Sequence, residues 1–352
     1  MVVIGAGVMG AAAAWQLARR GHRVTVLEQF DDGHTRGSSH GASRIFRLGY
    51  PDPFYVRLGQ DALSAWRDLE EQCGIQLIAP TGAVDFGDPE SVASVLAAMD
   101  AEGVVTELLT PAMATDRWPG MRFPGTAVFQ PGGGRIASGA ARMAMMEQAQ
   151  RHGAAFCWLM PVLGLEPAGD RVRVIAGDDV LVVDTVVVAA GAWVDRVAGP
   201  HVTLPPFTVT QESVFHFAPR ATPSWWPSLI HHGSTSVYGL ETPGVGVKLA
   251  EHHTGPVVDP FTRDGVIDPG SRERIVQFVE EWMPGLVPIP VDEVTCLYTT
   301  TATEDFVIDR SGPVVVASPC SGHGFKFAPL VGALVADCVD GQDPPARFAG
   351  SS

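Results

Sequence analysis

The sequence predicts an α/β fold of two domains: a Rossmann-like domain of alternating strands and helices and, inserted into it, a second domain built on an antiparallel sheet. A strand, a glycine-rich turn and a helix open the chain, and buried β-branched runs recur at 181–193 and 314–317. Stretches rich in Pro and Gly, with short strand-like runs, lie between these segments. A chain of 352 residues also exceeds the length at which one core usually stops growing.

The first thirty residues have the pattern of a dinucleotide-binding turn. A short apolar strand leads into GAGVMG at residues 5–10, an alanine-rich helix follows, and a second apolar strand ends at Glu28. Gly5 permits the tight turn, Gly7 lets the backbone approach a pyrophosphate, and Gly10 lets helix and strand pack closely. Glu28 would accept a hydrogen bond from a ribose hydroxyl. The pattern alone does not distinguish FAD from NAD, and a glycine-rich turn without nucleotide is the alternative.

The later elements extend this alternation. The β-branched run at 181–193 ends in small residues and a glycine, which predicts one buried parallel strand. The other elements expected in this domain are a helix over 138–150, strands over 154–159, 171–176 and 314–317, and a helix over 328–338. Short strand-like runs at 209–217 and 245–249 indicate the antiparallel sheet. The predicted dinucleotide-binding domain comprises 1–76, 134–200 and 303–352, and the predicted substrate domain comprises 77–133 and 201–302.

Composition excludes several classes of function. The chain has 39 acidic and 24 basic residues, a net charge of -15, which argues against nucleic-acid binding. No apolar run approaches the ~20 residues that span a bilayer, and the chain begins almost directly with a strand, so we expect a soluble, cytoplasmic protein without a signal peptide. The five cysteines are scattered without C-x-x-C spacing, which fits neither a disulfide framework nor a zinc site. We expect reduced thiols and no metal.

Two arginines follow the acidic strand end in a segment of small residues, 37–47. Arg44 and Arg47 are three residues apart, so a helical turn here would place both guanidinium groups on one face. Such a pair could lie beside a cofactor or a carboxylate, since the planar donor fork of Arg suits both. The alternative is a solvated loop with two ordinary surface arginines.

Lys326 lies between Phe325 and Phe327, after a strand and before an apolar helix. An isolated lysine in such a setting costs several kcal/mol unless an anion meets it. A substrate carboxylate or an anionic cofactor ring would be a suitable partner for Lys326. The start of the following helix adds positive potential at the same place. The alternative is a Lys326 side chain that extends to solvent.

A second lysine, Lys248, lies in an alternating apolar run. Strand periodicity places Lys248 on the same side as His252, so both could project into one cavity. A purely structural role for His252 is the alternative. Cys296 alone does not indicate a function either, because a single cysteine is more often a buried apolar residue than a reactive one.

Taken together, these segments resemble the monomeric sarcosine oxidase and N-methyltryptophan oxidase family, within the wider D-amino-acid-oxidase-like flavoproteins. The resemblance covers nearly the whole chain. It rests on the glycine turn and on segments 39–47, 190–193, 248–252, 296–299, 305–309 and 321–326. It implies a Rossmann-like FAD-binding domain, with FAD held covalently by a cysteine thioether to the flavin 8α-methyl. Cys296 matches that cysteine, and Cys320 is a rival thiol.

The resemblance also implies roles for individual residues. Arg47 and Lys326 match the pair that binds the substrate carboxylate. Arg44 and Lys248 match the cations at the flavin ring, and Lys248 matches the site where oxygen is reduced. The residues that match the amine end of the substrate pocket are Tyr238, His252, Gly322 and His323. The implied cofactor contacts are Gly5, Gly7, Gly10, Glu28, Ser39, His40, Arg44, Gly191, Trp193, Cys296, Gly322, Gly324, Phe325 and Lys326.

The implied activity is oxidation of a secondary amino acid such as sarcosine or another N-methyl or cyclic amino acid. The substrate binds with a neutral amine, a hydride equivalent passes to flavin N5, and dioxygen takes up the electrons. The products are hydrogen peroxide and an imine that hydrolyses. The expected partners are therefore a small amino acid and dioxygen, and the expected state is a monomer. The alternatives are an NAD-dependent dehydrogenase, a flavoprotein without turnover or, within the family, a biosynthetic oxidase of cyclic imino acids.

Overall fold

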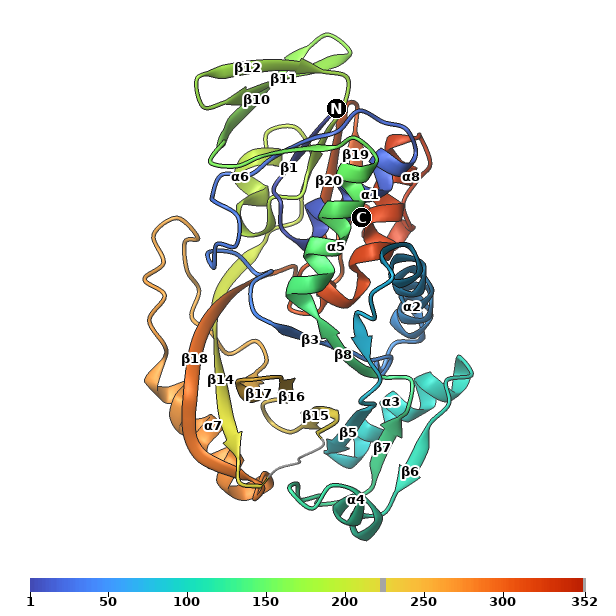
Figure 1. The fold of residues 1–352 in the computed structure, drawn as a ribbon, viewed down its shortest axis with the longest axis vertical. Coiled ribbons are helices and arrows are strands. Elements are labelled where there is room, and N and C mark those ends of the chain that lie inside the picture. Colours follow the sequence, from blue (N-terminus) through green and yellow to red (C-terminus); the bar gives the residue numbers. More distant parts are fainter. Residues whose placement is uncertain (222–225, 351–352) are drawn as a thin grey trace.

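The computed structural model describes residues 1–221 and 226–350 and contains two large sheets, one above the other in Figure 1. The upper sheet has six strands. In order across the sheet they are β19 (Val307–Ser311), β20 (Val314–Ser318), β13 (Val186–Val188), β1 (Val2–Ile4), β2 (Thr25–Leu27) and β9 (Ala155–Cys157). Neighbouring strands are parallel except β19 and β20, which form an antiparallel pair. The predicted Rossmann-like α/β fold is confirmed.

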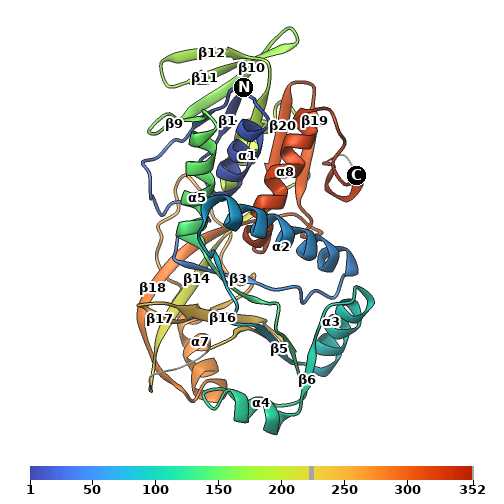
Figure 2. The same cartoon turned by 45° about the vertical axis from the view of Figure 1, so that its right-hand side comes forward.

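Both faces of this sheet are covered, which is why its strands are short and almost wholly apolar. Val3 faces the helices, whereas Val2 and Ile4 face a small antiparallel sheet. The helices on the first side are α1 (Val8–Arg19), α5 (Ser138–Arg151) and α8 (Ala328–Val339), with α2 (Pro53–Cys73) beyond them, as Figure 2 shows. The second side carries β10 (Val162–Ala168), β11 (Arg171–Ala176), β12 (Asp179–Val183) and α6 (Val194–Ala198).

The prediction of one parallel strand over 181–193 was wrong. The segment Asp179–Val183 is the antiparallel strand β12, and only Val186–Val188 enters the parallel sheet. The 171–176 segment was also misplaced, because it is β11 of the same small sheet. In that strand Val172 and Val174 are buried while Arg171 and Arg173 are exposed, and this period of two is typical of a strand with one solvated face.

The lower sheet has eight strands and is antiparallel except between β15 and β5. In order they are β18 (Leu286–Thr300), β14 (Thr208–Pro219), β17 (Gly246–Glu251), β16 (Val237–Thr242), β15 (Ser228–His232), β5 (Ala83–Gly87), β7 (Ala127–Gln130) and β6 (Glu107–Leu109). Its helices are α3 (Pro89–Ala101), α4 (Pro111–Arg117) and α7 (Pro269–Trp282). All eight strands lie in the two stretches, 77–133 and 201–302, that the sequence analysis assigns to the substrate domain. This division into domains stays a proposal.

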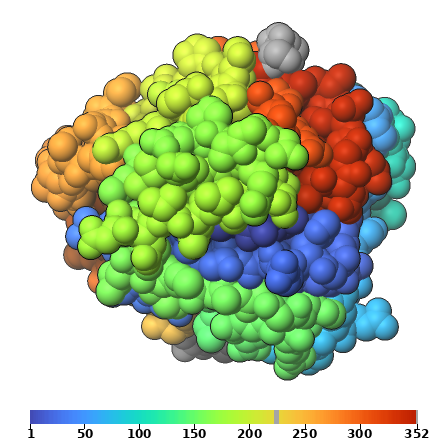
Figure 3. Space-filling view, turned by 90° about the horizontal axis from the view of Figure 1, so that it is seen from above, coloured from blue at the N-terminus to red at the C-terminus, as the bar shows by residue number. Residues whose placement is uncertain are grey.

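A short sheet connects the upper and lower parts of the molecule. It consists of β3 (Ser43–Phe46), β8 (Gly134–Ala137) and β4 (Ile78–Ala79). Seen from above, in Figure 3, the segment around β10–β12 packs beside the N-terminal and C-terminal segments, so that parts far apart in the sequence share one face. Among the described residues, no helix is both long enough and apolar enough to cross a membrane.

Candidate active site

A cavity of about 750 Å³ extends from the glycine turn after β1 to the eight-stranded sheet. Its walls come from the β1–α1 turn, residues 33–47, residues 189–197, strands β14 to β18 and the loop before α8. The upper end lies where the parallel strands β1 and β13 end, which is the edge at which open α/β sheets bind ligands. The antiparallel sheet forms the lower end.

All but one of the predicted site residues line this cavity. They are Gly5, Gly7, Glu28, Ser39, His40, Arg44, Arg47, Gly191, Trp193, Tyr238, Lys248, His252, Cys296, Gly322, His323, Gly324, Phe325 and Lys326. The exception is Gly10, which lies behind the turn and packs against the backbone of Gly5. The roles of these residues toward substrate and cofactor stay proposals.

The glycine turn is built on contacts that only glycine allows. Gly5 has a φ of +98°, and a Cβ there would lie 2.5 Å from the carbonyl oxygen of Ala189. A Cβ on Gly10 would lie 1.8 Å from the carbonyl oxygen of Gly5. Helix α1 therefore starts directly against the strand, and its first turn lines the cavity.

We predict that Gly10→Ala separates the helix from the turn. Because the obstructing atom belongs to the backbone, the free energy of unfolding should fall by about 1–3 kcal/mol, with loss of the flavin that the resemblance implies. Gly125→Ala is the matched control, since a Cβ there meets nothing within 4 Å. Urea unfolding and the flavin-to-protein absorbance ratio measure both effects. Equal behaviour of the two variants would contradict this account of the turn.

Glu28 is buried at the end of β2, and its two carboxylate oxygens are already engaged. Oε2 accepts a hydrogen bond from the backbone N–H of Ala6 at 2.7 Å, and Oε1 accepts one from that of Phe30 at 3.1 Å. Each carboxylate oxygen has a second lone pair, so Glu28 can still accept from a ligand hydroxyl. The carboxylate also holds the glycine turn in place.

Three of the longer helices, α1, α5 and α8, start at this cavity without a capping side chain on the residue before them. Helices α2, α3, α4 and α7 begin with a capping Asp or Thr, whereas α1, α5 and α8 have none. Gly7 at the start of α1, Gly139 in the first turn of α5 and Lys326 just before α8 all line the cavity. The first N–H of α1 donates to Oγ of Ser39 and that of α5 donates to the carbonyl of Ala42, so it is the positive ends of the helix dipoles that favour an anionic ligand.

Buried polar atoms without a partner also point to a ligand. Nε2 of His40, Nη1 of Arg47 and Nε1 of Trp193 are buried and form no hydrogen bond. Each of these residues lines the cavity. Since buried polar atoms are nearly always paired in folded proteins, a ligand with several acceptors fits this site. An anionic dinucleotide has the extended shape and the acceptors that the cavity requires.

Arg44 lies in strand β3, so the helical turn that would have placed Arg44 and Arg47 on one face does not form. The guanidinium of Arg44 donates to three backbone carbonyls, those of Ser38, His40 and Ser43, at 2.6–2.9 Å. These bonds fold the loop before β3 around the guanidinium and leave its positive charge without a carboxylate partner. The ring of Phe325 lies 5.4 Å from the guanidinium carbon.

The chain contains only two lysines, Lys248 and Lys326, and both are buried in this cavity. Nζ of Lys248 donates to the carbonyl oxygen of Ser43 at 2.8 Å. Burial, reinforced by Arg44, lowers the pKa of Lys248 well below its usual value. The solvent-exposed cations of the described chain are arginines, so lysine is used here where a compact, protonatable point charge is needed.

Lys326 and Arg47 form a second pair of cationic residues, and both lie beside Tyr50. Nζ of Lys326 donates to the Tyr50 hydroxyl at 2.6 Å and lies 5.0 Å from the ring centroid. The guanidinium carbon of Arg47 lies 4.7 Å from the same centroid. Burial and the charge of Arg47 lower the pKa of Lys326 well below its usual value. Neither cation forms an ion pair within the described residues, so an anion is the missing partner.

Two neutral imidazoles lie beside this pair. Burial and neighbouring positive groups lower the pKa of His252 to about 2 and that of His323 to about 3. Nδ1 of His252 is 3.4 Å from the Tyr298 hydroxyl. Gly322 has a φ of +74°, and a Cβ there would lie 2.4 Å from the Tyr298 ring and 2.8 Å from His252. This end of the cavity is therefore narrow, and its histidines add no positive charge.

Two thiols line the cavity, Cys296 on β18 and Cys320 in the loop before α8. All five cysteines are free. Burial raises the pKa of both thiols, that of Cys320 to about 11. At Cys296 the charges of Arg44, Lys248 and Arg263 lower the pKa and that of Glu212 raises it, whereas Cys320 has only a hydrogen bond with Thr299 that lowers its pKa.

Sequence reasoning missed three residues of this site. Tyr50 binds Lys326, Tyr298 contacts His252, and Nη1 of Arg142 on α5 donates to the carbonyl of Ala6 at 3.2 Å. Arg142 also pairs with Asp32. Tyr50 and Arg142 belong to no motif, and Tyr298 lies in segment 296–299 but received no role there. Each of the three acts on a residue distant in the sequence, so no local signal identifies these contacts.

Comparison with known proteins gives a consistent result. Residues 1–338 match the family model described as "FAD dependent oxidoreductase", DAO. The chain is 31% identical to the monomeric sarcosine oxidase of Bacillus sp. (strain NS-129), covering 96% of this chain and 91% of that protein. It is 28% identical to the N-methyl-L-tryptophan oxidase of Yersinia pestis (strain Pestoides F), covering 98% and 95%. The structure of NikD, an unusual amino acid oxidase essential for nikkomycin biosynthesis, has a TM-score of 0.88 and 29% identity over 99% of this chain and 96% of that one.

Proposed function

Because this chain belongs to the DAO family of FAD-dependent oxidoreductases, we propose that it oxidises secondary amino acids, of the N-methyl or cyclic kind, with dioxygen as the electron acceptor. The observation that carries the proposal is the pair of buried cations, Arg47 and Lys326, without a carboxylate partner of their own. An amino acid supplies that carboxylate. The relatives act, by their names, on sarcosine and N-methyltryptophan, which supports the same substrate class here. The NAD-dependent alternative is not favoured.

The cation pair would fix the substrate by its carboxylate. The guanidinium of Arg47 can donate two hydrogen bonds to the carboxylate oxygens, and Lys326 is oriented by its hydrogen bond to Tyr50. The stack of Tyr50 on Tyr55, at 5.3 Å between centroids, holds the Tyr50 ring in position. The carboxylate would then lie at one end of the cavity with the amine directed toward His252 and Tyr298.

The amine would bind in its neutral form, because burial and the nearby charges of Arg47 and Lys326, which also act on His252, disfavour an ammonium group there. The adjoining neutral imidazoles can accept a hydrogen bond from the amine. With a pKa of about 2, His252 stays unprotonated throughout the neutral range. When bound, FAD supplies the electron acceptor for the C–H bond next to this amine and passes the electrons to dioxygen. The chain itself provides orientation, exclusion of water and positive charge.

Arg44 and Lys248 would supply the positive charge at the redox centre. Both are fixed to the backbone near Ser43, so their charges need no rearrangement when negative charge develops in the cavity. Lys248 is the better candidate for the site of oxygen reduction, because it is buried and carries protons that it can share. The uncapped start of α8 adds to the same potential.

For the cofactor we propose attachment through Cys296. Attachment requires a thiolate, and Arg44, Lys248 and Arg263 favour the thiolate at Cys296, whereas no cation does so at Cys320. We predict that Cys296→Ser releases its flavin on acid precipitation while Cys320→Ser retains it. The absorbance of pellet and supernatant measures the result. Retention of flavin by Cys296→Ser, or its release from the unmodified protein, would contradict the proposal.

The experiment that tests the proposed function is a peroxide-coupled screen of the purified protein. Sarcosine, N-methyltryptophan, proline and pipecolate sample small, bulky and cyclic secondary amino acids, and the corresponding primary amino acids are the control. We expect peroxide and loss of at least one secondary amino acid. A flavin-loaded protein that forms no peroxide with any of them would contradict the proposal and favour binding without turnover. We also propose that the protein acts as a monomer, as the names of several relatives suggest.

A further inference from the structure

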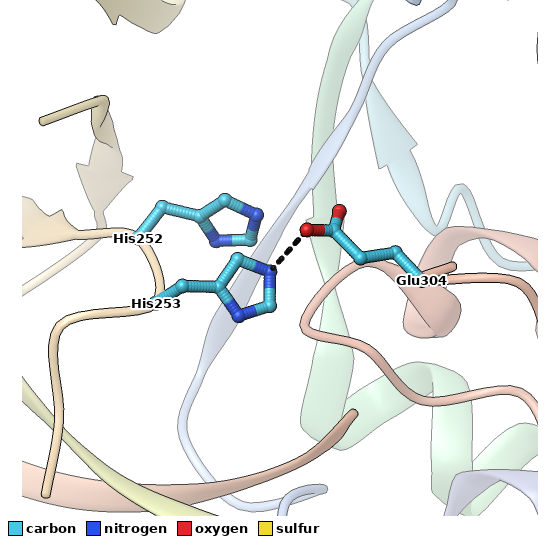
Figure 4. Close-up of side chains that lie close together, drawn as sticks. All are labelled: His252, His253 and Glu304. Atoms are coloured by element: carbon cyan, nitrogen blue, oxygen red, sulfur yellow. Dashed lines mark ion pairs between the residues drawn. The ribbon is translucent and has the colours of Figure 1, made fainter. Parts of the chain in front are cut away.

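A cluster of two histidines and a glutamate lies at the amine end of the cavity. His252 and His253 follow strand β17, and Glu304 lies in the loop between β18 and β19 (Figure 4). One ring nitrogen of each imidazole and one carboxylate oxygen of Glu304 all lie within 4.8 Å of one another. The His252 and His253 rings are 4.0 Å apart between centroids. His253 itself does not line the cavity, so the function proposed above assigns it no role.

The distance between His253 and Glu304 suits a small metal ion between them better than a direct hydrogen bond. Nε2 of His253 is 3.7 Å from Oε1 of Glu304, too far for a hydrogen bond, and this buried nitrogen has no other partner. Two ligand atoms about 2.1 Å from a tetrahedral Zn²⁺ are roughly 3.4 Å from each other. A shift of a few tenths of an ångström would therefore bring both atoms into coordination range.

The backbone holds the three side chains close together. His253 and Glu304 both have left-handed φ values, +59° and +61°, which are uncommon for residues other than glycine and cost of order 1 kcal/mol or more. The carbonyl oxygen of Glu304 also lies 3.1 Å from Nε2 of His323, which ties this loop to the wall of the cavity. Nδ1 of His252 faces the Tyr298 hydroxyl, a contact that orients the ring as metal ligands require.

The donor set selects the kind of metal. Two imidazoles and one carboxylate form the three-ligand set of open zinc sites, in which water or a substrate atom takes the fourth position. Mg²⁺ and Ca²⁺ require mainly oxygen ligands and would not be held here. The positive charges of Arg47 and Lys326 act on His252 and repel any cation bound there. Ions held by charge attraction alone are therefore further disfavoured relative to an ion held by bonds to nitrogen ligands.

We propose that His252, His253 and Glu304 bind one Zn²⁺ ion, and that this ion reversibly inhibits the oxidase. The inhibition rests on the proposed function, because it assumes that the substrate amine lies beside His252. The open coordination position would take the lone pair of that amine, and a nitrogen whose lone pair is bound to zinc cannot assist the departure of hydride from the neighbouring carbon. The ion would also restrict the narrow pocket between Gly322 and Tyr298.

The test measures zinc binding first and activity second. The purified flavoprotein is dialysed against buffered Zn²⁺, and bound metal is determined by mass spectrometry for the unmodified chain, His253→Asn, Glu304→Gln and the control His152→Asn, whose histidine is exposed at the end of α5. We expect one Zn²⁺ per chain, with affinity at least about tenfold lower in His253→Asn and Glu304→Gln and unchanged in His152→Asn. Added Zn²⁺ should then suppress peroxide formation reversibly with EDTA, except in His253→Asn.

Two results would overturn the inference. Either the unmodified flavoprotein binds no Zn²⁺, or its zinc stoichiometry and affinity persist in both His253→Asn and Glu304→Gln. These results are distinguishable from failure of the proposed function. Zinc bound through these residues in a protein that oxidises no amine would contradict the oxidase but not the site, and amine oxidation without zinc binding would do the reverse.

Discussion

Lys248→Met is expected to slow the reaction of the protein's flavin with dioxygen by about 10²–10³-fold, with a much smaller effect on its reduction by substrate. Lys248 is buried in the cavity and fixed by the carbonyl of Ser43, so its amino group is in place, and negative charge that develops beside it favours its protonated form. Met has similar length and removes only the ammonium group. Arg44 remains in the variant, so the positive charge at the cofactor is reduced and not abolished.

Stopped-flow measurements separate the two half-reactions. Reduction is followed anaerobically with the best substrate of the peroxide screen, and reoxidation is followed after mixing the reduced protein with dioxygen. The matched control is Lys326→Met, the other lysine of the chain, which we expect to impair substrate binding and leave reoxidation nearly unchanged. Equal slowing of both half-reactions by Lys248→Met would show that Lys248 has no specific role toward dioxygen.

The second large effect concerns the substrate carboxylate. Arg47→Met should lower kcat/KM for an amino acid by roughly 10–100-fold, because a hydrogen bond to a charged group is worth about 1.5–3 kcal/mol. Lys326→Met should have a similar effect. The double variant should lose less than the product of the two, since both cations act on one carboxylate and share Tyr50.

A comparison of substrates gives this prediction its specificity. The variants and the unmodified chain are assayed with an N-methyl amino acid and with the matching N-methyl amine that lacks the carboxylate. The preference for the amino acid should collapse in Arg47→Met and persist in the control Arg171→Met, an exposed arginine of β11. If Arg47→Met reduced the rates with both compounds equally, its role would be structural.

The sequence predicted those parts of the fold that depend on local pattern. The turn at Gly5 to Gly10, helices α5 and α8, and strand β20 follow from glycine spacing and from apolar periodicity, and all are present near their expected bounds. The run at 181–193 was misread because valines stand on both sides of Asp184 and Thr185, and at these two residues the chain passes from one sheet to another. Periodicity in a single run does not reveal which sheet a strand joins.

For the site, too, local features were predictable from the sequence and contacts made by tertiary folding were not. Lys326 was identified by a physical conflict, a charge within an apolar segment, and the structure does bury it without an acidic partner. A helical turn would have placed Arg44 and Arg47 on one face, yet Arg44 is a strand residue that donates to three carbonyls. Tyr50 and Arg142 escaped prediction because their importance arises from partners that tertiary folding brings to them.

The central claim is that this cavity brings a secondary amino acid, held by Arg47 and Lys326, to a bound FAD. Anaerobic titration of the purified flavoprotein tests it directly, with the spectrum of the oxidised flavin as the readout. Our account predicts that a secondary amino acid bleaches the flavin, that its counterpart without a carboxylate does so far more weakly, and that NADH has no effect. Bleaching by NADH with none by any secondary amino acid would contradict the account.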